Sequence, residues 1–549
     1  MSIFSKVARN RVPSSVFNLS HRVKMSGKFG YIYPIYVDEI LPGDRFNVRT
    51  DVFMRVAPLV APIMHEVSVF VHHFFVPCRL LWDNWEDFIT GGKDGTLAPV
   101  MPFFNNVGNA SYLYAYQKGT LWDYLGLPPQ TAIRSDSTVT TGFCGLPFRA
   151  YQLIWNEYYR DQTLHDEIDI MKEVDGLHSW SAEPVRVPAL LELRKRAWEK
   201  DYFTSALPFA QRGAEVRLPG GGSGYTDVEY FPDSAKSAGF VNNYGANVNP
   251  GNAQFKVDMS DTSRGILRDS SSSDSLQYDP DGTLKVLLQD IQGITVNELR
   301  RSVKLQTWLE RNARAGARYN EQILSHFDVV VPDARLQRPE FLGGSRMPIV
   351  ISEVLQTSET NNTAGQESPQ GGMAGHGIAA GRGNGFTRRF TEHGYVMSLL
   401  SVRPRTAYQD GVPRMYYKRD KFDFAFPEFA NLGEQAIYQG EVNYDHTKNP
   451  FGEVNTKTFG YTPRYAEYKY HPSRVAGDMR DTLQFWHLGR KFAPNTEVPL
   501  NANFVTVDED NEDLRRIFAV QDGTDYLWFE IAHHIRARRP LPYFGTPRL

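Results

Sequence analysis

The chain has 549 residues, of which 41% are hydrophobic and 13% aromatic, and 60 Lys and Arg against 63 Asp and Glu give a net charge of −3. So many large apolar side chains exclude a disordered chain, and the charge balance excludes a globally basic nucleic-acid binder. Its two cysteines, Cys78 and Cys144, are too few for a disulfide framework or a four-cysteine metal cluster, and they favour a reducing compartment.

Membrane insertion and secretion are not predicted. The longest apolar stretches, such as residues 57–64, contain proline and fall well short of the roughly 20 residues of a membrane helix. The N-terminus has no apolar core of signal-peptide length. We therefore expect a protein that is made and used in a cytoplasm.

Strand patterns stand at both ends of the chain. Residues 30–40, 44–56 and 65–76 are rich in Val, Ile, Phe and Tyr and are separated by turn residues, which predicts three successive strands. Residues 526–540 repeat the pattern, and we expect this last strand to pair with an early one. Helical patterns interrupt the strands without alternating with them, which argues against a parallel βαβ architecture.

Two helices are predicted between the strands. Aromatic residues recur at spacings of three and four from Phe148 to Tyr158, which predicts a helix whose aromatic face is buried. A second helix is expected to begin at Thr295, because Thr295 and Glu298 have the spacing of a capping box, and to end at Gly316.

Two segments fit neither the helical nor the strand period. Residues 214–293 carry 11 acids and 6 bases and several glycine and serine runs, which predicts a long surface insertion. In residues 365–385, 8 of 21 residues are glycine. The glycines of this second segment match neither a P-loop nor a dinucleotide-binding motif, so we expect no nucleotide site there.

Basic residues gather at the two ends. Six precede the first acid, Asp38, and four follow the last acid, Glu530, which leaves a charge of −13 between them. Basic arms commonly contact phosphate backbones. The alternative, that they aid solubility or pair with the acidic body, stays open.

No motif for catalysis or metal binding emerges. The pairs His72-His73 and His533-His534 lie in strand patterns, where adjacent side chains point to opposite faces, so neither pair predicts a metal site. The acidic run 508–513 lacks the glycine of a calcium loop. We therefore expect a structural or binding protein without a cofactor or bound metal, and not an enzyme.

The strings DEILPGD, FFVPCRLLWDNWEDFITGG, LPFRAYQLIWNEYYRDQTL, KDYFTSALPFAQRG and DARLQRPEFLGG follow one another along the chain. Together they closely resemble the major capsid proteins of the microviruses, small single-stranded DNA bacteriophages, in their gokushovirus branch. The resemblance covers nearly the whole chain and is faint over residues 214–293.

The resemblance implies a mainly β fold: an eight-stranded antiparallel jelly roll of the viral capsid type with long, partly helical insertions between strands. Residues 1–29 would be a basic N-terminal arm and residues 30–549 a single jelly-roll domain. Identical copies would form a T=1 icosahedral shell around circular single-stranded DNA. The insertion 214–293 would form a protrusion at the threefold axes that touches the host.

Site residues and partners are expected accordingly. The candidate DNA contacts are Arg9, Arg11, Arg22, Lys24, Arg536, Arg538 and Arg539, and the candidate host contacts are Tyr225, Tyr230, Phe240 and Tyr244. Expected partners are identical copies, the DNA genome, a small basic DNA-binding virion protein, an internal scaffolding protein, a DNA pilot protein and a host-cell surface receptor. Assembly is expected in the host bacterial cytoplasm. The main alternative is a carbohydrate-active or glycan-binding β-sandwich protein; a phage fibre or adhesin would more often show internal repeats.

Overall fold

The computed structural model describes residues 13–105, 110–132, 142–180, 182–214, 296–315, 318–355, 373–508, 514–520 and 523–544. It also describes six short strands: β8 (Phe240–Val241), β9 (Phe255–Asp258), β10 (Ile266–Asp269), β11 (Gln277–Tyr278), β14 (Thr360–Asn361) and β15 (Glu367–Ser368). The chain divides into two compact units, residues 1–212 with 310–549 and residues 213–309.

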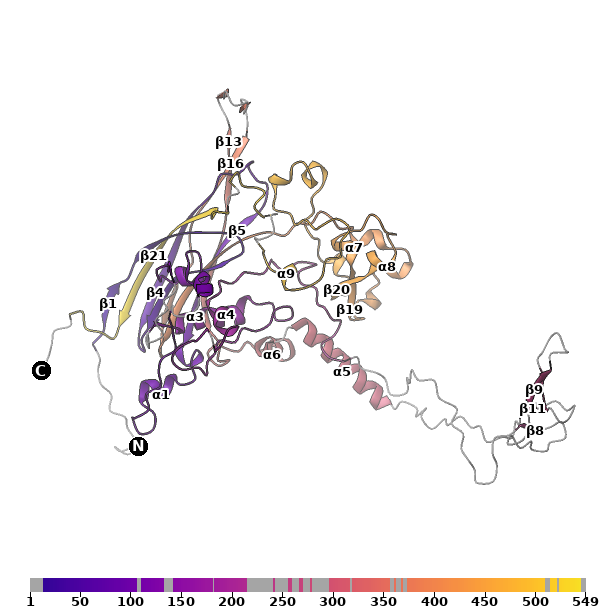
Figure 1. Ribbon diagram of the computed structural model, residues 1–549, viewed down its shortest axis with the longest axis horizontal. Helices are drawn as coiled ribbons and strands as arrows, with labels where there is room; N and C mark the ends of the chain where they lie inside the picture. The colour runs from indigo at the N-terminus through magenta and orange to yellow at the C-terminus, as the bar shows by residue number, and fades with distance from the viewer. Residues whose placement is uncertain are drawn as a thin grey trace. The chain divides into compact units, whose positions relative to one another are not determined.

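Two antiparallel sheets form the centre of the first unit (Figure 1). The first sheet comprises β1 (Ser15–Asn18), β2 (His21–Gly27), β4 (Arg45–Val56), β13 (Val350–Leu355), β16 (Met373–Arg382), β17 (Phe386–Arg389) and β21 (Leu527–Arg539). β21 lies between β4 on one side and β1 and β2 on the other, and β16 joins β4 to β13. The second sheet has the order β12 (Glu340–Pro348), β5 (Val67–Pro77), β18 (Gly394–Pro404) and β3 (Ile32–Ile40). The predicted early strands are confirmed, and so is the pairing of the last strand with early ones.

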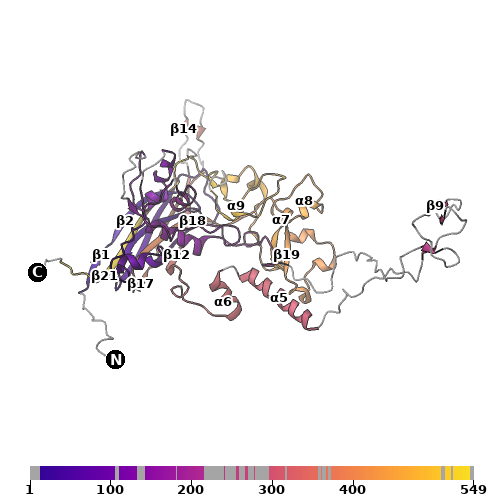
Figure 2. The same cartoon turned by 60° about the horizontal axis from the view of Figure 1, so that its bottom comes forward.

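Pairing is nested along the chain. β2 pairs with β21, β3 with β18, β4 with β16 and β17, and β5 with β12, and every pair is antiparallel. Figure 2 shows β1, β2, β21 and β17 together on one flank of this two-sheet arrangement. Strands that are hundreds of residues apart are therefore neighbours in space.

The two sheets differ in how much of each is buried. β4 alternates strictly between exposed or half-buried and buried residues, whereas ten of the eleven residues of β5 are buried. A strand covered on both faces is apolar throughout, while one covered on a single face alternates. The continuous run of buried residues in β5 shows that the second sheet is covered on both faces. The alternation in β4 shows that the first sheet is covered on one face and has a free outer face.

A helical insertion between β5 and β12 supplies the second cover. Its predicted aromatic helix is α3 (Leu146–Ile154), continued by a π-helical turn (Trp155–Tyr159). Phe148, Tyr151 and Trp155 are buried in one cluster with Phe74 of β5 and Leu399 of β18. The prediction of a buried aromatic face is confirmed, because α3 packs against the side of the second sheet that faces away from the first.

The remaining elements lie in insertions. Helices are α1 (Trp85–Thr90), α2 (Leu121–Tyr124), α4 (Arg186–Leu191), α5 (Val296–Ala315), α6 (Tyr319–Phe327), α7 (Gln439–Val442), α8 (Glu453–Thr456) and α9 (Ala502–Val505). Short 3-10 turns span Cys78–Leu80, Ala110–Tyr116, Arg414–Tyr417, Lys421–Asp423, Pro427–Phe429, Ala466–Tyr468, Gly477–Arg480 and Gln484–Trp486. β6 (Phe103–Phe104) pairs with β7 (Phe143–Cys144), and β19 (Glu434–Tyr438) with β20 (Thr458–Pro463). α5 confirms the second predicted helix, although Thr295 and Gly316 lie outside the described residues. Among the helices that the structure describes, none has the length and apolarity needed to cross a membrane.

The glycine-rich segment corrects an expectation. Residues 373–382, which fit neither period in the sequence, form β16. A Cβ on Gly375 would lie 2.7 Å from Pro62 Cα, and one on Gly377 would lie 2.9 Å from Val56 Cγ2. The strand pattern is hidden because close packing demands glycine where a strand would otherwise carry Val or Ile.

Two histidines are buried with hydrogen-bonding partners. His533 Nε2 lies 3.0 Å from the carbonyl oxygen of Ile35, and its Nδ1 lies 3.0 Å from Thr50 Oγ1. His73 Nδ1 lies 2.7 Å from Ser398 Oγ. Burial lowers the pKa of each imidazole to about 4.

We predict that Gly375→Ala lowers the free energy of unfolding by about 1 to 3 kcal/mol, because the new methyl meets fixed backbone atoms of Ala61 and Pro62. Urea denaturation of the purified protomer measures this loss. The matched control is Gly381→Ala, whose Cβ meets only the flexible Met347 side chain. Equal losses for the two variants would contradict the explanation.

The buried histidines predict acid sensitivity. An unfolded histidine takes up its proton near pH 6.5, whereas these stay neutral in the fold down to about pH 4. Stability is therefore full above pH 6.5 and falls between pH 6.5 and 4, by up to about 1.4 kcal/mol per pH unit for each histidine. His533→Gln should make this fall shallower in urea titrations at pH 7 and pH 5. His534→Gln, on the exposed face of the same strand, is the control, and identical slopes for both variants would refute the assignment.

Candidate nucleic-acid interface

The free face of the first sheet, here called the outer sheet face, collects alternate residues of several strands. On β4 every second residue from Arg45 to Arg55 is exposed or half-buried. The alternate residues, from Phe46 to Val56, are buried. On β21 the corresponding positions run from Trp528 to Arg538. Strand alternation therefore sends every second side chain of both strands outward.

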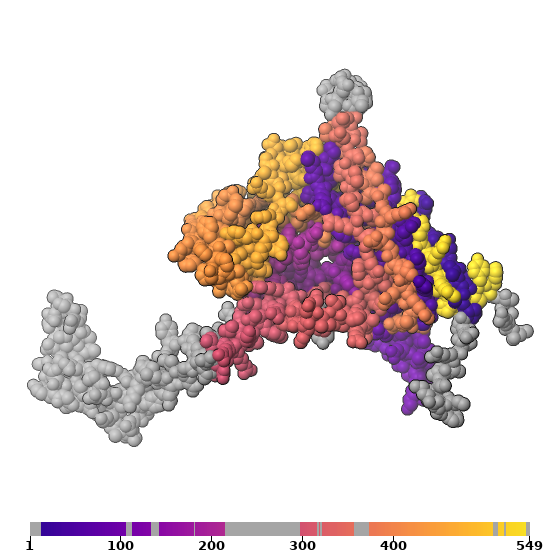
Figure 3. All heavy atoms as spheres, turned by 180° about the vertical axis from the view of Figure 1, so that it is seen from behind, coloured from indigo at the N-terminus to yellow at the C-terminus, as the bar shows by residue number. Residues whose placement is uncertain are grey.

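Strand register brings these outward side chains together. Arg45 is opposite Arg538, and Arg55 is opposite Trp528. On the other side of β21, Lys24 of β2 is opposite Glu530. Residues directly opposite one another in an antiparallel pair share a face. In Figure 3 β4 (indigo) and β21 (yellow) lie side by side on one flank of the molecule.

Most of the charge on the outer sheet face is positive. Its basic side chains are Arg22, Lys24, Arg45, Arg49, Arg55, Arg382, Arg389, Arg536 and Arg538. Its acidic side chains on the same strands are Asp51 and Glu530. Glu530 pairs with Arg22 at 3.1 Å, and Asp51 pairs with Arg49 at 3.4 Å and with His534 at 3.1 Å. The other basic side chains of this face make no ion pair with a described residue.

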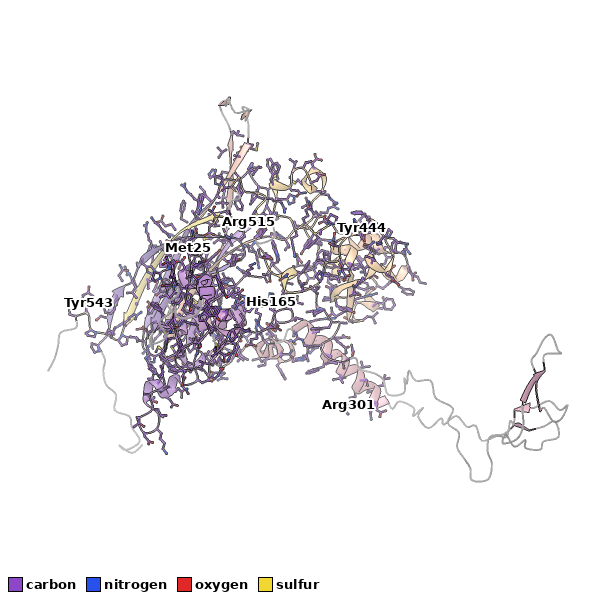
Figure 4. All side chains as sticks on the ribbon, viewed as in Figure 1. Met25, His165, Arg301, Tyr444, Arg515 and Tyr543 are labelled. Atoms are coloured by element: carbon purple, nitrogen blue, oxygen red, sulfur yellow. The ribbon has the colours of Figure 1, made fainter. Side chains whose placement is uncertain are left out.

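Aromatic side chains stand among these charges. Trp528 is 46% exposed and Phe53 is 39% exposed. The Arg55 guanidinium lies 5.6 Å from the centre of the Phe53 ring. Tyr543, labelled in Figure 4, stacks on Phe17 of β1 with ring centroids 5.9 Å apart, but Phe17 is opposite the buried Ala537, so this pair lies on the inner side of the sheet and not on the outer sheet face. A basic surface with exposed ring faces can bind phosphates and unstacked bases together.

A groove adjoins the outer sheet face where β2 ends. It has a volume of about 1650 Å³ and is lined by Lys24, Lys118, Tyr114 and Tyr124, among other residues. Lys24 therefore borders both the groove and the outer sheet face. The Tyr124 hydroxyl donates a hydrogen bond to the carbonyl oxygen of Ser26, 2.9 Å away, which ties this side of the groove to β2.

The predicted DNA-contact residues divide into three groups. Arg22, Lys24, Arg536 and Arg538 meet on the outer sheet face, although more than 500 residues separate the two pairs. Arg539 does not join them. Its guanidinium donates to Asp38 Oδ2 at 3.0 Å and stands 5.1 Å from the centre of the Phe46 ring.

Arg539 is thus held on the inner side of the sheet, because it follows Arg538 by one residue and side chains alternate along a strand. Its side chain is 16% exposed. Arg9 and Arg11 lie outside the described residues, as do Tyr225, Tyr230 and Tyr244. Phe240 is described only as the first residue of the short strand β8.

Reasoning from the sequence missed the arginines of β4, β16 and β17. Arg45, Arg49 and Arg55 lie in the predicted second strand, where polar and basic residues occupy every second position. That alternation is the signal that could have found them. Arg382 and Arg389 gave no such signal, since the glycines around them hide the strand period.

No group of three or more potential ligand side chains for a metal ion exists among the residues that the structure describes. The pairs His72-His73 and His533-His534 are split between opposite sides of their strands, as predicted: His72 meets the Tyr159 hydroxyl and His73 meets Ser398. His534 faces Asp51 on the outer sheet face. The charged groups and exposed rings of this face act by electrostatic attraction and stacking.

Comparison with known proteins gives the context of this surface. A family model described as "Capsid protein (F protein)" matches residues 5–549. Capsid protein VP1 of Chlamydia phage 1 is 35% identical, over 100% of this chain and 97% of the relative. Capsid proteins VP1 of Bdellovibrio phage phiMH2K and Spiroplasma virus 4 are 34% and 29% identical, over 99% and 100% of this chain and 97% of each relative. With matches along its whole length, the chain belongs to the phage capsid protein (F protein) family and has the structural role of a virion component.

Proposed function

We propose that this protein is the major capsid protein of a microvirus and that identical copies close into a T=1 icosahedral shell around circular single-stranded DNA. Membership of the capsid family supports the assembly of identical copies. The observation that carries the DNA contact is the outer sheet face, where basic side chains outnumber acids and most make no ion pair with any residue that the structure describes. We place this face on the inside of the shell.

The nested strand pairs support a jelly roll of the viral capsid type. Taken in chain order, β2, β3, β4, β5, β12, β16 with β17, β18 and β21 pair first with last, second with seventh, third with sixth and fourth with fifth. A long antiparallel hairpin that rolls into two facing sheets gives this pattern. Most of the chain then lies in insertions, which tile the contacts between neighbouring copies.

Single-stranded DNA matches the chemistry of the outer sheet face. Clustered arginines repel one another, and a polyanion relieves that repulsion while releasing its own counterions. Trp528 and Phe53 offer ring faces to unstacked bases, each stacking contact contributing about 1 to 3 kcal/mol without sequence preference. Arg9 and Arg11 belong to the part of the basic N-terminal arm that precedes β1, and in this proposal they extend the same basic surface.

Further partners follow from the charge of the chain. Between its basic ends the chain carries −13, so it cannot neutralise a genome alone. We propose that a small basic virion protein supplies the missing positive charge. An internal scaffolding protein and a DNA pilot protein complete the proposed set, and assembly takes place in the bacterial cytoplasm.

We propose that residues 214–293 form the protrusion at the threefold axes and touch a receptor on the host surface. They lie within the separate compact unit 213–309. Their net charge of −5 suits an outward position better than one beside DNA.

Replacing Arg45, Arg536 and Arg538 together by alanine should weaken DNA binding while shells still form. Three lost phosphate contacts lower the slope of log affinity against log salt concentration by about 2 for single-stranded DNA. Titration of purified protomers with a thymidine oligonucleotide at several salt concentrations measures the slope. The DNA content of purified particles of the triple variant should also be lower than that of wild-type particles.

The matched control removes the same charge elsewhere, in Lys93→Ala/Arg335→Ala/Lys448→Ala, all exposed positions away from the outer sheet face. Its salt slope should equal that of the wild type. If both triple variants change the slope equally, the binding reflects net charge and not this face.

Deletion of residues 225–285 should impair attachment to host cells at least tenfold while leaving shell formation intact, because the deleted residues lie within a separate compact unit. Adsorption of labelled particles to host cells measures attachment, and sedimentation measures shell yield. Failure of the deleted chain to form shells would make this unit an assembly element and refute the receptor role.

A further inference from the structure

A lobe of the first unit exposes a run of aromatic side chains that no described residue of this unit covers. We call it the aromatic patch, and it consists of Met415, Tyr416, Phe422, Phe424, Phe426, Leu432, Tyr468 and Tyr470, which are between 40% and 65% exposed. Contiguous apolar surface of this kind is uncommon on a protein that works alone and marks a surface for another macromolecule.

The aromatic patch is built as one surface. The amide N–H of Ala425 donates a hydrogen bond to the Tyr468 hydroxyl, 3.3 Å away. The amide N–H of Phe426 donates one to the Tyr465 hydroxyl, also 3.3 Å away. The rings of Phe422 and Phe426 both contact Phe429, with centroids 6.0 and 6.2 Å apart. Segments 415–432 and 465–470 are therefore fastened to each other, and the exposed rings are held in place before any partner arrives.

Cations rim the aromatic patch. Lys418 Nζ lies 4.0 Å from the centre of the Tyr468 ring, Arg419 stands over Phe451, and Lys421 Nζ lies 5.0 Å from the Phe422 ring. None of these cations forms an ion pair with a described residue. The nearby carboxylates are engaged with backbone: Asp423 accepts from the N–H groups of Arg419 and Asp420.

A second exposed surface of the same unit has the opposite charge. Residues 83–100, here the acidic loop, include α1 and carry the exposed apolar side chains Phe88, Ile89, Leu97 and Val100. Glu86, Asp87 and Asp94 stand among them and make no ion pair with a described residue. Gly91 caps the C-terminus of α1, where its N–H donates a hydrogen bond to the carbonyl oxygen of Asp87 at 2.8 Å.

The two surfaces cannot meet within one copy. Figure 1 shows α1 and the lobe that carries α7 and α8 on different flanks of the sheets, and Figure 4 labels Tyr444 in that lobe. A contact between two different surfaces of identical copies is heterologous, and it closes into rings when the rotation between copies allows. Apolar area with opposite charge on the two sides fits such a contact.

We propose that the aromatic patch of one copy docks on the acidic loop of a second copy, with Arg419 and Lys421 facing Glu86 and Asp87. The proposal rests on the proposed assembly into a shell and names one of its contacts. Aromatic side chains supply the buried area, and the charges select the correct neighbour.

Charge reversal with rescue tests the pairing. Arg419→Glu/Lys421→Glu and Glu86→Lys/Asp87→Lys should each lower shell yield at least tenfold in cells that make the full set of phage structural proteins, because like charges then meet at every copy of the contact. The quadruple variant should restore the yield. Sucrose-gradient sedimentation separates shells from free protomers, and circular dichroism of the protomers shows whether each variant is folded.

A control separates pairing from net charge. Arg419→Glu/Lys421→Glu combined with Glu39→Lys/Glu353→Lys has the same net charge as the quadruple variant. Its added lysines lie in β3 and β13 and not in the acidic loop. It should not regain shells. Phe422→Ser/Phe424→Ser, which keeps every charge, should lose shells while its protomer stays folded, since both rings are half exposed.

Normal shell yield in either charge-reversal variant overturns the proposal. Failure of the quadruple variant to regain shells also overturns it, and that result would assign the aromatic patch to a different partner such as a scaffolding protein. Variants that form shells but lose DNA would overturn it in favour of a DNA contact. If the wild-type chain itself forms no shells, the proposed function fails, and that result is distinct from all of these.

Discussion

The pairing of β21 with β2 on one side and β4 on the other is the contact on which the rest of the structure depends. It joins the last strand to early ones and thereby places β21 inside the first sheet, between β2 and β4. It also carries both basic ends of the chain to one place, because Arg22 and Lys24 arrive on β2 and Arg536 and Arg538 on β21. Without this register the basic residues would remain two separate tails.

Unequal covering of the two sheets decides where function can lie. The second sheet is covered by the first sheet on one side and by the α3 insertion on the other, so its central strands β5 and β18 are buried along almost their whole length. The first sheet keeps one face free, and that face is basic. Insertions that leave β5 and β18 then build the aromatic patch and the acidic loop, which lie away from the sheets' shared core. Packing, DNA contact and copy-to-copy contact are thus separated on different surfaces.

Much of the central fold could be predicted from the sequence. The alternation of residues 44–56 and the apolar run of residues 65–76 predicted β4 and β5, and the aromatic spacing from Phe148 predicted α3. β16 could not be found, because Gly375 and Gly377 serve close packing and erase the strand period. Four of the predicted DNA-contact residues meet on the outer sheet face. Arg539 does not, since charge alone cannot tell which of two adjacent arginines points to Asp38.

In the proposed shell the outer sheet face lies against packaged DNA. Ultraviolet cross-linking of intact, DNA-filled particles, followed by mass spectrometry of the cross-linked peptides, tests it most directly, because Trp528 and Phe53 stand among the arginines of that face. We expect nucleotide adducts on the peptides of β4 and β21, and protection of Arg45 and Arg536 from arginine-modifying reagents until the particles are opened. Adducts confined to other peptides, together with free modification of these arginines on closed particles, would contradict it.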